Sequence, residues 1–292
     1  MTAASLIVTL LLADPAVATP SREAVVTVAV ENMYGSADDT ANVVSQATLG
    51  QVVQVLETSG VHARVRTPDT YEGWIPRPAI MEYLDAVPRY ARSGKLVEVT
   101  SLMANVYRNP DVTTARPLVL APLASRLELR EDGPGGQWLA VRLPNGDAGY
   151  VQQGDVRPVD STQARPRGSG ADLVATARRF MGTPYLWGGM TVHGIDCSGL
   201  VSRVYHANGV ELLRDADLQF ADPNAAPVAR EALEPGDLLF FGKDPASITH
   251  FGMYLGEGRF ISATTHEVPA VREDRLDDPY WTAIYQGARR PR

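Results

Sequence analysis

Short runs of alternating apolar and polar residues dominate the first part of the chain. Between residues 25 and 82 such runs occur at 25–30, 50–56 and 61–66, with turn residues between them. Strands of this length that alternate in polarity and follow one another at close spacing are typical of a small barrel. We therefore predict an all-β domain over residues 25–82.

The same order of patterns returns between residues 97 and 158. Gly73-Trp74-Ile75 in the first part matches Gly149-Tyr150-Val151 in the second. Repetition at this scale predicts a second copy of the same module over residues 97–158. Residues 159–170 are rich in Ser, Pro, Gly and Arg and have no apolar period, so we expect a linker there.

The pattern changes to helical spacing after the linker. Residues 172–180 carry apolar side chains at helical intervals, and residues 198–207 do so again. Further along, an apolar run at 250–255 is joined by a glycine-containing turn to a second run at 259–263, which predicts a β-hairpin. Helices followed by an antiparallel sheet predict an α+β domain over residues 171–292.

Residues 1–24 are a candidate export leader. Residues 3–13 are mostly apolar, and Ala16-Val17-Ala18 are small residues of the kind that precede a signal cleavage site. An ordinary N-terminal strand is the alternative, because no basic residue precedes the apolar run. The run is shorter than the ~20 residues of a transmembrane helix, so we expect no transmembrane segment. If residues 1–24 are a leader, the protein is expected to be periplasmic or extracellular. If they are an ordinary N-terminal strand, a cytoplasmic location is expected.

Charge and composition exclude several classes of function. The 292 residues carry a formal net charge of −7, and nucleic-acid binding needs a basic surface, so nucleic acid is not an expected partner. One cysteine excludes an internal disulfide, and the five histidines show no zinc-ligand spacing. We therefore expect no metal and no organic cofactor. The sequence leaves the oligomeric state open.

The single cysteine, Cys197, lies between a turn-rich segment and a predicted helix. At a helix N-terminus the dipole and the unpaired N–H groups favour a thiolate, which is the nucleophilic form. Burial as ordinary core is the alternative for a lone cysteine. A nucleophilic thiol needs a neighbouring base, and His250 is the best candidate because it opens a strand after a polar stretch.

The motifs TPYLWGG, GIDCSGLV, PGDLLFF and HFGMYLGEGRFI occur in this order between residues 183 and 261. Together they resemble the NlpC family of papain-like cell-wall cysteine peptidases over residues 170–292. The resemblance implies that Cys197 is the nucleophile and His250 the base. Most members place a third polar residue, usually histidine, twelve positions after the base. That position holds Ser262 here, and His266 is the alternative partner for the imidazole.

The repeated β modules resemble bacterial SH3-like domains. The whole chain then resembles γ-D-glutamyl-L-diamino acid endopeptidases, with an α+β papain-like catalytic domain preceded by two small all-β SH3-like barrels. In such enzymes the first barrel narrows the cleft, and an acid and a tyrosine bind the free amine of the substrate's N-terminal L-alanine. We expect Asp196 to turn toward that amine, and Tyr185 to join the Cys197 N–H as an oxyanion donor. The candidate substrate-binding residues are Glu72, Tyr107, Tyr185, Trp187, Asp196, Ser198 and Asp215.

The resemblance implies a substrate class among peptidoglycan-derived peptides. The expected reaction is cleavage of the γ-D-glutamyl-L-diamino acid amide bond in stem peptides with a free N-terminal L-alanine, through an acyl-enzyme. A broader hydrolase of intact cell wall is one alternative. A non-catalytic wall-binding protein is another, because Ser262 departs from the usual histidine. Lysine and diaminopimelate both remain open as the diamino acid.

Overall fold

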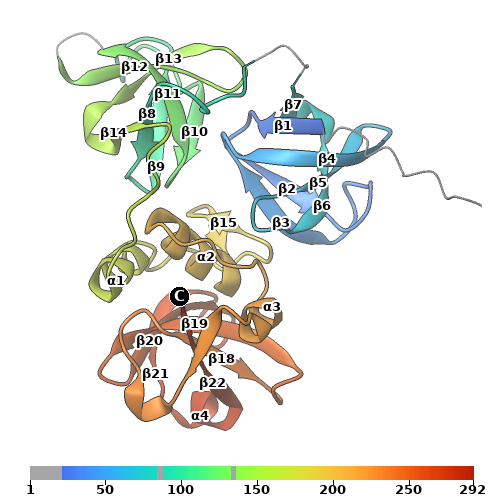
Figure 1. The fold of residues 1–292 in the computed structure, drawn as a ribbon, viewed down its shortest axis with the longest axis vertical. Coiled ribbons are helices and arrows are strands. Elements are labelled where there is room, and N and C mark those ends of the chain that lie inside the picture. Colours follow the sequence, from blue (N-terminus) through green and yellow to red (C-terminus); the bar gives the residue numbers. More distant parts are fainter. Residues whose placement is uncertain (1–21, 84–87, 133–135) are drawn as a thin grey trace, which may run out of the picture.

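A computed structural model describes residues 22–83, 88–132 and 136–292 (Figure 1). Residues 1–21, which include most of the predicted export leader, lie outside the described residues. Within the described ranges, no helix is long and apolar enough to cross a membrane.

The first β unit is one seven-stranded antiparallel sheet. Its strands lie in the order β3-β2-β6-β5-β4-β1-β7. The run at 25–30, predicted as one strand, is instead divided by a turn between β1 and β2. The strands are β1 (Arg22–Val26), β2 (Val30–Tyr34), β3 (Val43–Thr48), β4 (Val52–Ser59), β5 (His62–Arg66), β6 (Glu72–Pro76) and β7 (Ile80–Glu82), with a 3-10 turn at Arg77–Ala79.

The second β unit has the same topology. Its order, β10-β9-β13-β12-β11-β8-β14, is that of the first sheet with each strand number raised by seven. The sequence repeat therefore has a counterpart in the order in which the strands pair. The strands are β8 (Lys95–Val99), β9 (Met103–Tyr107), β10 (Val119–Pro122), β11 (Arg126–Asp132), β12 (Trp138–Arg142), β13 (Ala148–Gln152) and β14 (Val156–Asp160), with a 3-10 turn at Gln153–Asp155.

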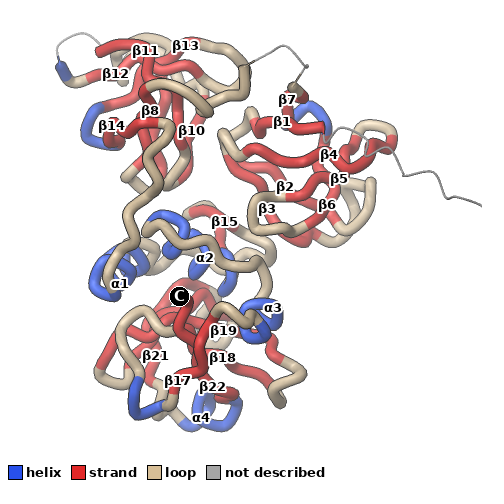
Figure 2. Tube along the Cα trace, viewed as in Figure 1, coloured by secondary structure: helices blue, strands red, loops and turns tan. Residues whose placement is uncertain are grey.

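The remaining residues form helices and a six-stranded antiparallel sheet of order β17-β22-β18-β19-β20-β21. Figure 2 shows strands throughout the two β units and helices concentrated in this third unit. Helices α1 to α3 precede the sheet, as the sequence pattern predicts, whereas α4 lies between its last two strands. The elements are α1 (Gly170–Arg178), β15 (Met190–Thr191), β16 (Gly194–Ile195), α2 (Cys197–Ala207), α3 (Ala216–Ala221), β17 (Ala225–Val228), a 3-10 turn (Arg230–Ala232), β18 (Leu238–Gly242), β19 (Ile248–Gly256), β20 (Arg259–Thr264), β21 (Ala270–Arg275), α4 (Pro279–Ile284) and β22 (Tyr285–Pro291).

Helix α2 is the central layer of the molecule. Leu200 and Val204 on this helix belong to the same buried cluster as Phe251 on β19. Leu123 and Ala124 of the second β unit join that cluster, so α2 is covered on two sides. Figure 1 shows α2 between the six-stranded sheet and the two β units. The position of Cys197, which begins this helix, therefore depends on packing against both the sheet and the second β unit.

Two equivalent glycines mark close strand crossings in the β units. A Cβ added to Gly149 on β13 would lie 2.6 Å from Val106 Cγ1 on β9, which is far below a normal contact. A Cβ on Gly73 of β6 would lie 2.9 Å from Met33 Cβ on β2. Overpacking of this kind forces backbone or side-chain shifts. The glycine that begins each repeated Gly-aromatic-aliphatic run is thus required by packing.

We predict that Gly149→Ala lowers the free energy of unfolding of the second β unit by about 1–3 kcal/mol. Gly154→Ala is the matched control, because no atom lies within 4 Å of an added Cβ there and its φ is not positive. Urea unfolding followed by the fluorescence of Trp138, which lies in this unit, measures both variants. Equal stability of the two variants would contradict the packing argument.

Candidate active site

Cys197 is the first residue of α2 and is buried. The backbone N–H groups of Phe251 and Ser198 lie within hydrogen-bonding reach of its sulfur. Because Phe251 follows His250 directly on β19, the thiol and the imidazole come from facing elements. The backbone next to His250 therefore lies against the start of α2, where this helix packs on the sheet.

The partner of the imidazole is Ser262 on β20. His250 Nε2 lies 3.1 Å from Ser262 Oγ, a direct hydrogen bond that needs no bridging water. His266 lies elsewhere, with its ring stacked on Tyr280 at 3.7 Å between centroids. Of the two partners considered from the sequence, only Ser262 makes a hydrogen bond to His250 among the described residues.

Aromatic side chains fix the plane of the His250 ring. Trp281, at the end of the chain on α4, stacks on it with 5.3 Å between centroids and an interplanar angle of 27°. Phe241 on β18 packs against both rings. Packing against these aromatic rings restricts the movement of the imidazole.

Asp196 caps the helix that carries the nucleophile. Its carboxylate accepts hydrogen bonds from the N–H groups of Gly199 at 2.6 Å and Gly188 at 2.8 Å. The side chain of Ser198 also donates to it. The bond from Gly199 satisfies one of the donors that a helix N-terminus leaves unpaired.

The same carboxylate forms a buried ion pair with Arg214. Arg214 Nη2 lies 2.8 Å from Asp196 Oδ2 and Nη1 lies 3.2 Å from Oδ1, and only 1% of Arg214 is exposed. Arg214 also donates to the Ser198 hydroxyl. The expectation that Asp196 turns toward a substrate amine is therefore corrected: both its oxygens are directed to the helix cap and to Arg214, and Ser198 belongs to the same network.

The first β unit completes this network. Arg214 Nε donates to Ser45 Oγ on β3 at 2.8 Å, which links the helix cap to the neighbouring unit. Trp187, a candidate from the sequence, donates its indole N–H to the Val43 carbonyl at 2.9 Å while 68% of its side chain stays exposed. Gln46 accepts a bond from the Met190 N–H at 2.9 Å. Val43 and Gln46 of β3 therefore contact the segment that leads to Cys197, and Ser45 between them contacts Arg214, which follows it.

Tyr185 lies beside the thiol. Burial raises the pKa of its hydroxyl, and so does the nearby Cys197, which places the two side chains in one electrostatic environment. Its backbone pairs with Ile195, two residues before the nucleophile. The backbone bridge to Ile195 thus holds Tyr185 near Cys197.

Asp215 is a half-buried carboxylate contacted by the first β unit. Burial raises its pKa, and the hydroxyl of Tyr71 lies close enough to oppose that rise. Glu72, the neighbouring residue predicted from the sequence, lies differently. Its carboxylate accepts bonds from Arg64 at 2.6 Å and Arg66 at 2.9 Å on the adjacent strand β5. Tyr71, rather than Glu72, makes the contact with the third unit.

Tyr107 is distant from this cluster. Leu102, just before β9, packs on the buried cluster around α2, whereas Tyr107 ends the strand roughly 15 Å farther along. Its ring packs edge-on against Trp138 of the same β unit, at 5.7 Å between centroids. The expectation that Tyr107 binds substrate together with Glu72 is corrected, because the strand runs away from the site.

Comparison with known proteins agrees with this geometry. The model of the NlpC/P60 family matches residues 182–290, and that of the bacterial dipeptidyl-peptidase Sh3 domain matches residues 33–80. A γ-D-glutamyl-L-lysine dipeptidyl-peptidase of Bacillus cereus is 30% identical over 259 residues, which cover 84% of this chain and 74% of that protein. The chain belongs to the NlpC/P60 family.

Other relatives cover the same extent. Dipeptidyl-peptidase 6 of Lysinibacillus sphaericus is 29% identical over 244 residues, or 82% of this chain and 87% of that protein. The crystal structure of an NlpC/P60 family protein from Bacillus cereus superposes with a TM-score of 0.81 at 25% identity, over 92% of this chain and 99% of the other. The third unit is thus a papain-like NlpC/P60 peptidase fold preceded by a β-rich region, and the chain is a cysteine peptidase.

Burial shifts the pKa values of Cys197 and His250 toward their neutral forms. Desolvation, assisted by the Asp196 carboxylate, raises the pKa of the Cys197 thiol to about 12. Desolvation likewise lowers the pKa of His250 to about 4, although Asp196 opposes this. The expectation that the helix N-terminus produces a resting thiolate is therefore wrong for this NlpC/P60 chain, because burial outweighs the dipole.

Several residues of the site have no signal in the sequence alone. Arg214, Ser45 and Tyr71 acquire their roles through contacts between segments far apart in the chain. Trp281 lies in an unremarkable C-terminal segment. Among the described residues, no group of three or more His, Cys, Asp or Glu side chains could hold a metal ion.

We predict that Ser262→Ala lowers kcat about tenfold or more with little change in KM, because the imidazole loses its hydrogen-bond partner. His266→Ala is the control and is expected to change kcat less than about twofold, since His266 contacts Tyr280 instead. Steady-state kinetics of both variants decide between the two partners. A larger loss in His266→Ala would overturn the assignment.

The neutral pair predicts an unusual pH profile. A base is lost when it is protonated, so kcat/KM falls as the pH drops through the pKa of free-enzyme His250. With that pKa lowered to about 4, activity at pH 5.5 is expected to stay within about twofold of that at pH 7. An ordinary histidine with a pKa near 6.5 would lose roughly eightfold over this range. A limb near pH 6.5 in the measured profile would contradict the burial argument.

Proposed function

We propose that this NlpC/P60 peptidase cleaves the γ-D-glutamyl-L-diamino acid amide bond of peptidoglycan-derived peptides that have a free N-terminal L-alanine. The observation that carries the proposal is the hydrogen bond between His250 and Ser262 on the sheet against which α2, the helix that begins at Cys197, packs. A half-buried carboxylate, Asp215, lies near Asp196, the residue before Cys197. Relatives named γ-D-glutamyl-L-lysine dipeptidyl-peptidase support the choice of bond.

In the proposed reaction, Cys197 attacks the scissile carbonyl as His250 removes its proton. In this proposal Nε2 carries the proton and donates to Ser262 Oγ, which leaves Nδ1 as the base. His250 then protonates the leaving amine, and water hydrolyses the acyl-enzyme with His250 again as base. Because both groups rest neutral, proton transfer accompanies attack.

The oxyanion of the tetrahedral intermediate needs donors in fixed positions. The N–H of Cys197 is at the first helical position, where a helix leaves donors unpaired. The Tyr185 hydroxyl is the second donor in this proposal, and its raised pKa keeps it protonated. The N-terminal dipole of α2 then acts on the intermediate's charge.

The two β units are proposed to be SH3-like barrels over residues 25–82 and 97–158, joined by the linker at 159–170 to the peptidase domain at 171–292. The shared strand order and the domain match at residues 33–80 support this division. We further propose that Asp215 with Tyr71 binds the substrate's amine, because a half-buried carboxylate pairs favourably with an ammonium group. Exposed Trp187 then supplies an apolar wall.

Export is part of the proposal. A peptidoglycan peptidase meets intact wall outside the cytoplasmic membrane, and residues 1–24 have the apolar run and small residues of a leader. N-terminal sequencing of the protein recovered from cells tests this directly.

The function is tested with four peptides: L-Ala-γ-D-Glu followed by lysine or by diaminopimelate, each with a free or an acetylated N-terminus. We expect cleavage of the free-amine peptides alone, detected by mass spectrometry, and none by Cys197→Ala. The lysine and diaminopimelate pair then identifies the diamino acid.

Asp215→Asn separates amine recognition from chemistry. It is expected to raise KM for the free-amine peptide by about tenfold, since a charge-assisted bond is lost. Equal cleavage of free and acetylated peptides by the native protein would retain the peptidase and refute the amine pocket. No cleavage of any peptide, with release of muropeptides from intact sacculi, would favour the broader hydrolase.

A further inference from the structure

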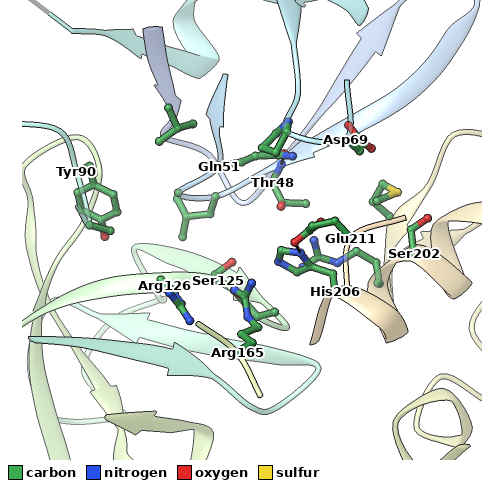
Figure 3. Close-up of a pocket in the computed structure, with 18 of the residues that line it drawn as sticks. Thr48, Gln51, Asp69, Tyr90, Ser125, Arg126, Arg165, Ser202, His206 and Glu211 are labelled. Carbon is green, nitrogen blue, oxygen red and sulfur yellow. Dashed lines mark hydrogen bonds and ion pairs between the residues drawn. The ribbon is translucent and has the colours of Figure 1, made fainter. Parts of the chain in front are cut away.

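A cavity of about 440 Å³ lies where the two β units meet the back of helix α2 (Figure 3). Ser202 and His206 on α2 line it, one to three turns beyond Cys197, or roughly 8–14 Å along the helix. The cavity is therefore separate from the catalytic residues. Its volume is in the range of small-ligand pockets, about 300–1,000 Å³.

Positive charge exceeds negative charge around this cavity. Arg126 and Arg165 line it, and both pair with one buried carboxylate, Glu98, at 2.8 Å and 2.7 Å. Arg157 pairs with the same carboxylate at 2.6 Å. Three guanidinium groups thus share one counter-charge, in a chain whose formal net charge is −7.

Arg203, also on the cavity wall, is a buried cation without an ion pair among the described residues. It is 7% exposed and donates to the Leu123 carbonyl. Burial, together with nearby Arg165, lowers its pKa to about 10. A buried unpaired charge is costly, so an anion beside Arg203 would be strongly favoured.

Two carboxylates also line the cavity, but each has a partner. Glu211 contacts His206 Nδ1, and 58% of its side chain is exposed. Asp69 accepts a hydrogen bond from the Thr67 hydroxyl. Both groups weaken the positive field without forming an ion pair with Arg203.

Two buried hydroxyls on the walls have no hydrogen-bond partner among the described protein groups. They are Ser125 Oγ of the second β unit and Ser202 Oγ of α2, whose residues are 6% and 7% exposed. Buried hydroxyls normally find acceptors. A ligand with oxygen acceptors would satisfy both and neutralise the neighbouring guanidinium groups.

We propose that this cavity binds a small organic oxyanion, whose carboxylate or phosphate group lies among Arg203, Arg165 and the hydroxyls of Ser125 and Ser202. Guanidinium groups bind both kinds of oxyanion through paired hydrogen bonds. The walls come from both β units and from α2, so the ligand stabilises the contact of these units with the helix that begins at Cys197. The inference is independent of which peptide bond the enzyme cleaves.

The first test is thermal unfolding of the full chain with sodium phosphate or sodium glutarate against sodium chloride at equal ionic strength. Each oxyanion that binds is expected to raise Tm by about 2–4 °C at concentrations well above its Kd. A shift with phosphate alone, or with glutarate alone, identifies the preferred group. If neither probe shifts Tm, the proposal is overturned, and the cavity binds no small oxyanion.

Ser125→Asp and Ser125→Asn form a matched pair. The aspartate places an anion inside the cavity, so it is expected to raise Tm in chloride and abolish the response to the oxyanion. The asparagine has the same size without the charge and is expected to keep the response. An unchanged response in Ser125→Asp would refute the site.

Arg203→Met is expected to weaken calorimetric binding of the active probe by about tenfold or more. Arg275→Met removes an exposed guanidinium paired with Asp277, and therefore controls for net charge. Its Kd is expected to change less than about twofold. Equal losses of affinity in both variants would show that binding follows the net charge of the protein, which would refute a specific site. If Arg203→Met fails to fold, the Ser125 pair decides the question.

Discussion

The buried ion pair between Arg214 and Asp196 is the interaction on which the active site depends. Asp196 caps α2 and so fixes the first turn that carries Cys197. Its charge is tolerable in the interior because Arg214 neutralises it with two hydrogen bonds. Removing one partner of such a pair typically costs about 3–5 kcal/mol, since the other charge remains buried. Arg214 thereby links helix capping, nucleophile position and the Ser45 contact to the first β unit.

This linkage makes the first β unit part of the active site rather than an appended module. Its strand β3 contacts Arg214, which pairs with the residue before the nucleophile, and also Trp187 and Met190 in the segment that leads to it. The second unit contacts α2 through the Leu123 carbonyl. Because α2 lies between these units and the six-stranded sheet, a displacement of either β unit is transmitted to the helix that begins at Cys197.

The parts of the site that the sequence predicts correctly are those set by local geometry. The hairpin of β19 and β20 has a register that places Ser262 across from Gly252, two residues from His250 on the same face. The resemblance to the NlpC family, whose members place a polar residue twelve positions after the base, therefore predicts that contact. The roles of Asp196, Glu72 and Tyr107 fail as predictions because their partners, Arg214, Arg64 and Trp138, belong to other segments or strands. Long-range pairing of this kind has no signature in a single sequence.

Burial of the catalytic pair changes the role of the helix dipole. If Cys197 rested as a thiolate, the N-terminus of α2 would stabilise the ground state and lower the nucleophile's reactivity. With the thiol pKa raised to about 12 and the imidazole pKa lowered to about 4, both groups are neutral until the substrate is attacked. The dipole and the N–H groups near Cys197 then act only on the charge that develops. Interactions that strengthen in the transition state are those that increase kcat, so a neutral resting pair at a helix N-terminus is consistent with efficient catalysis.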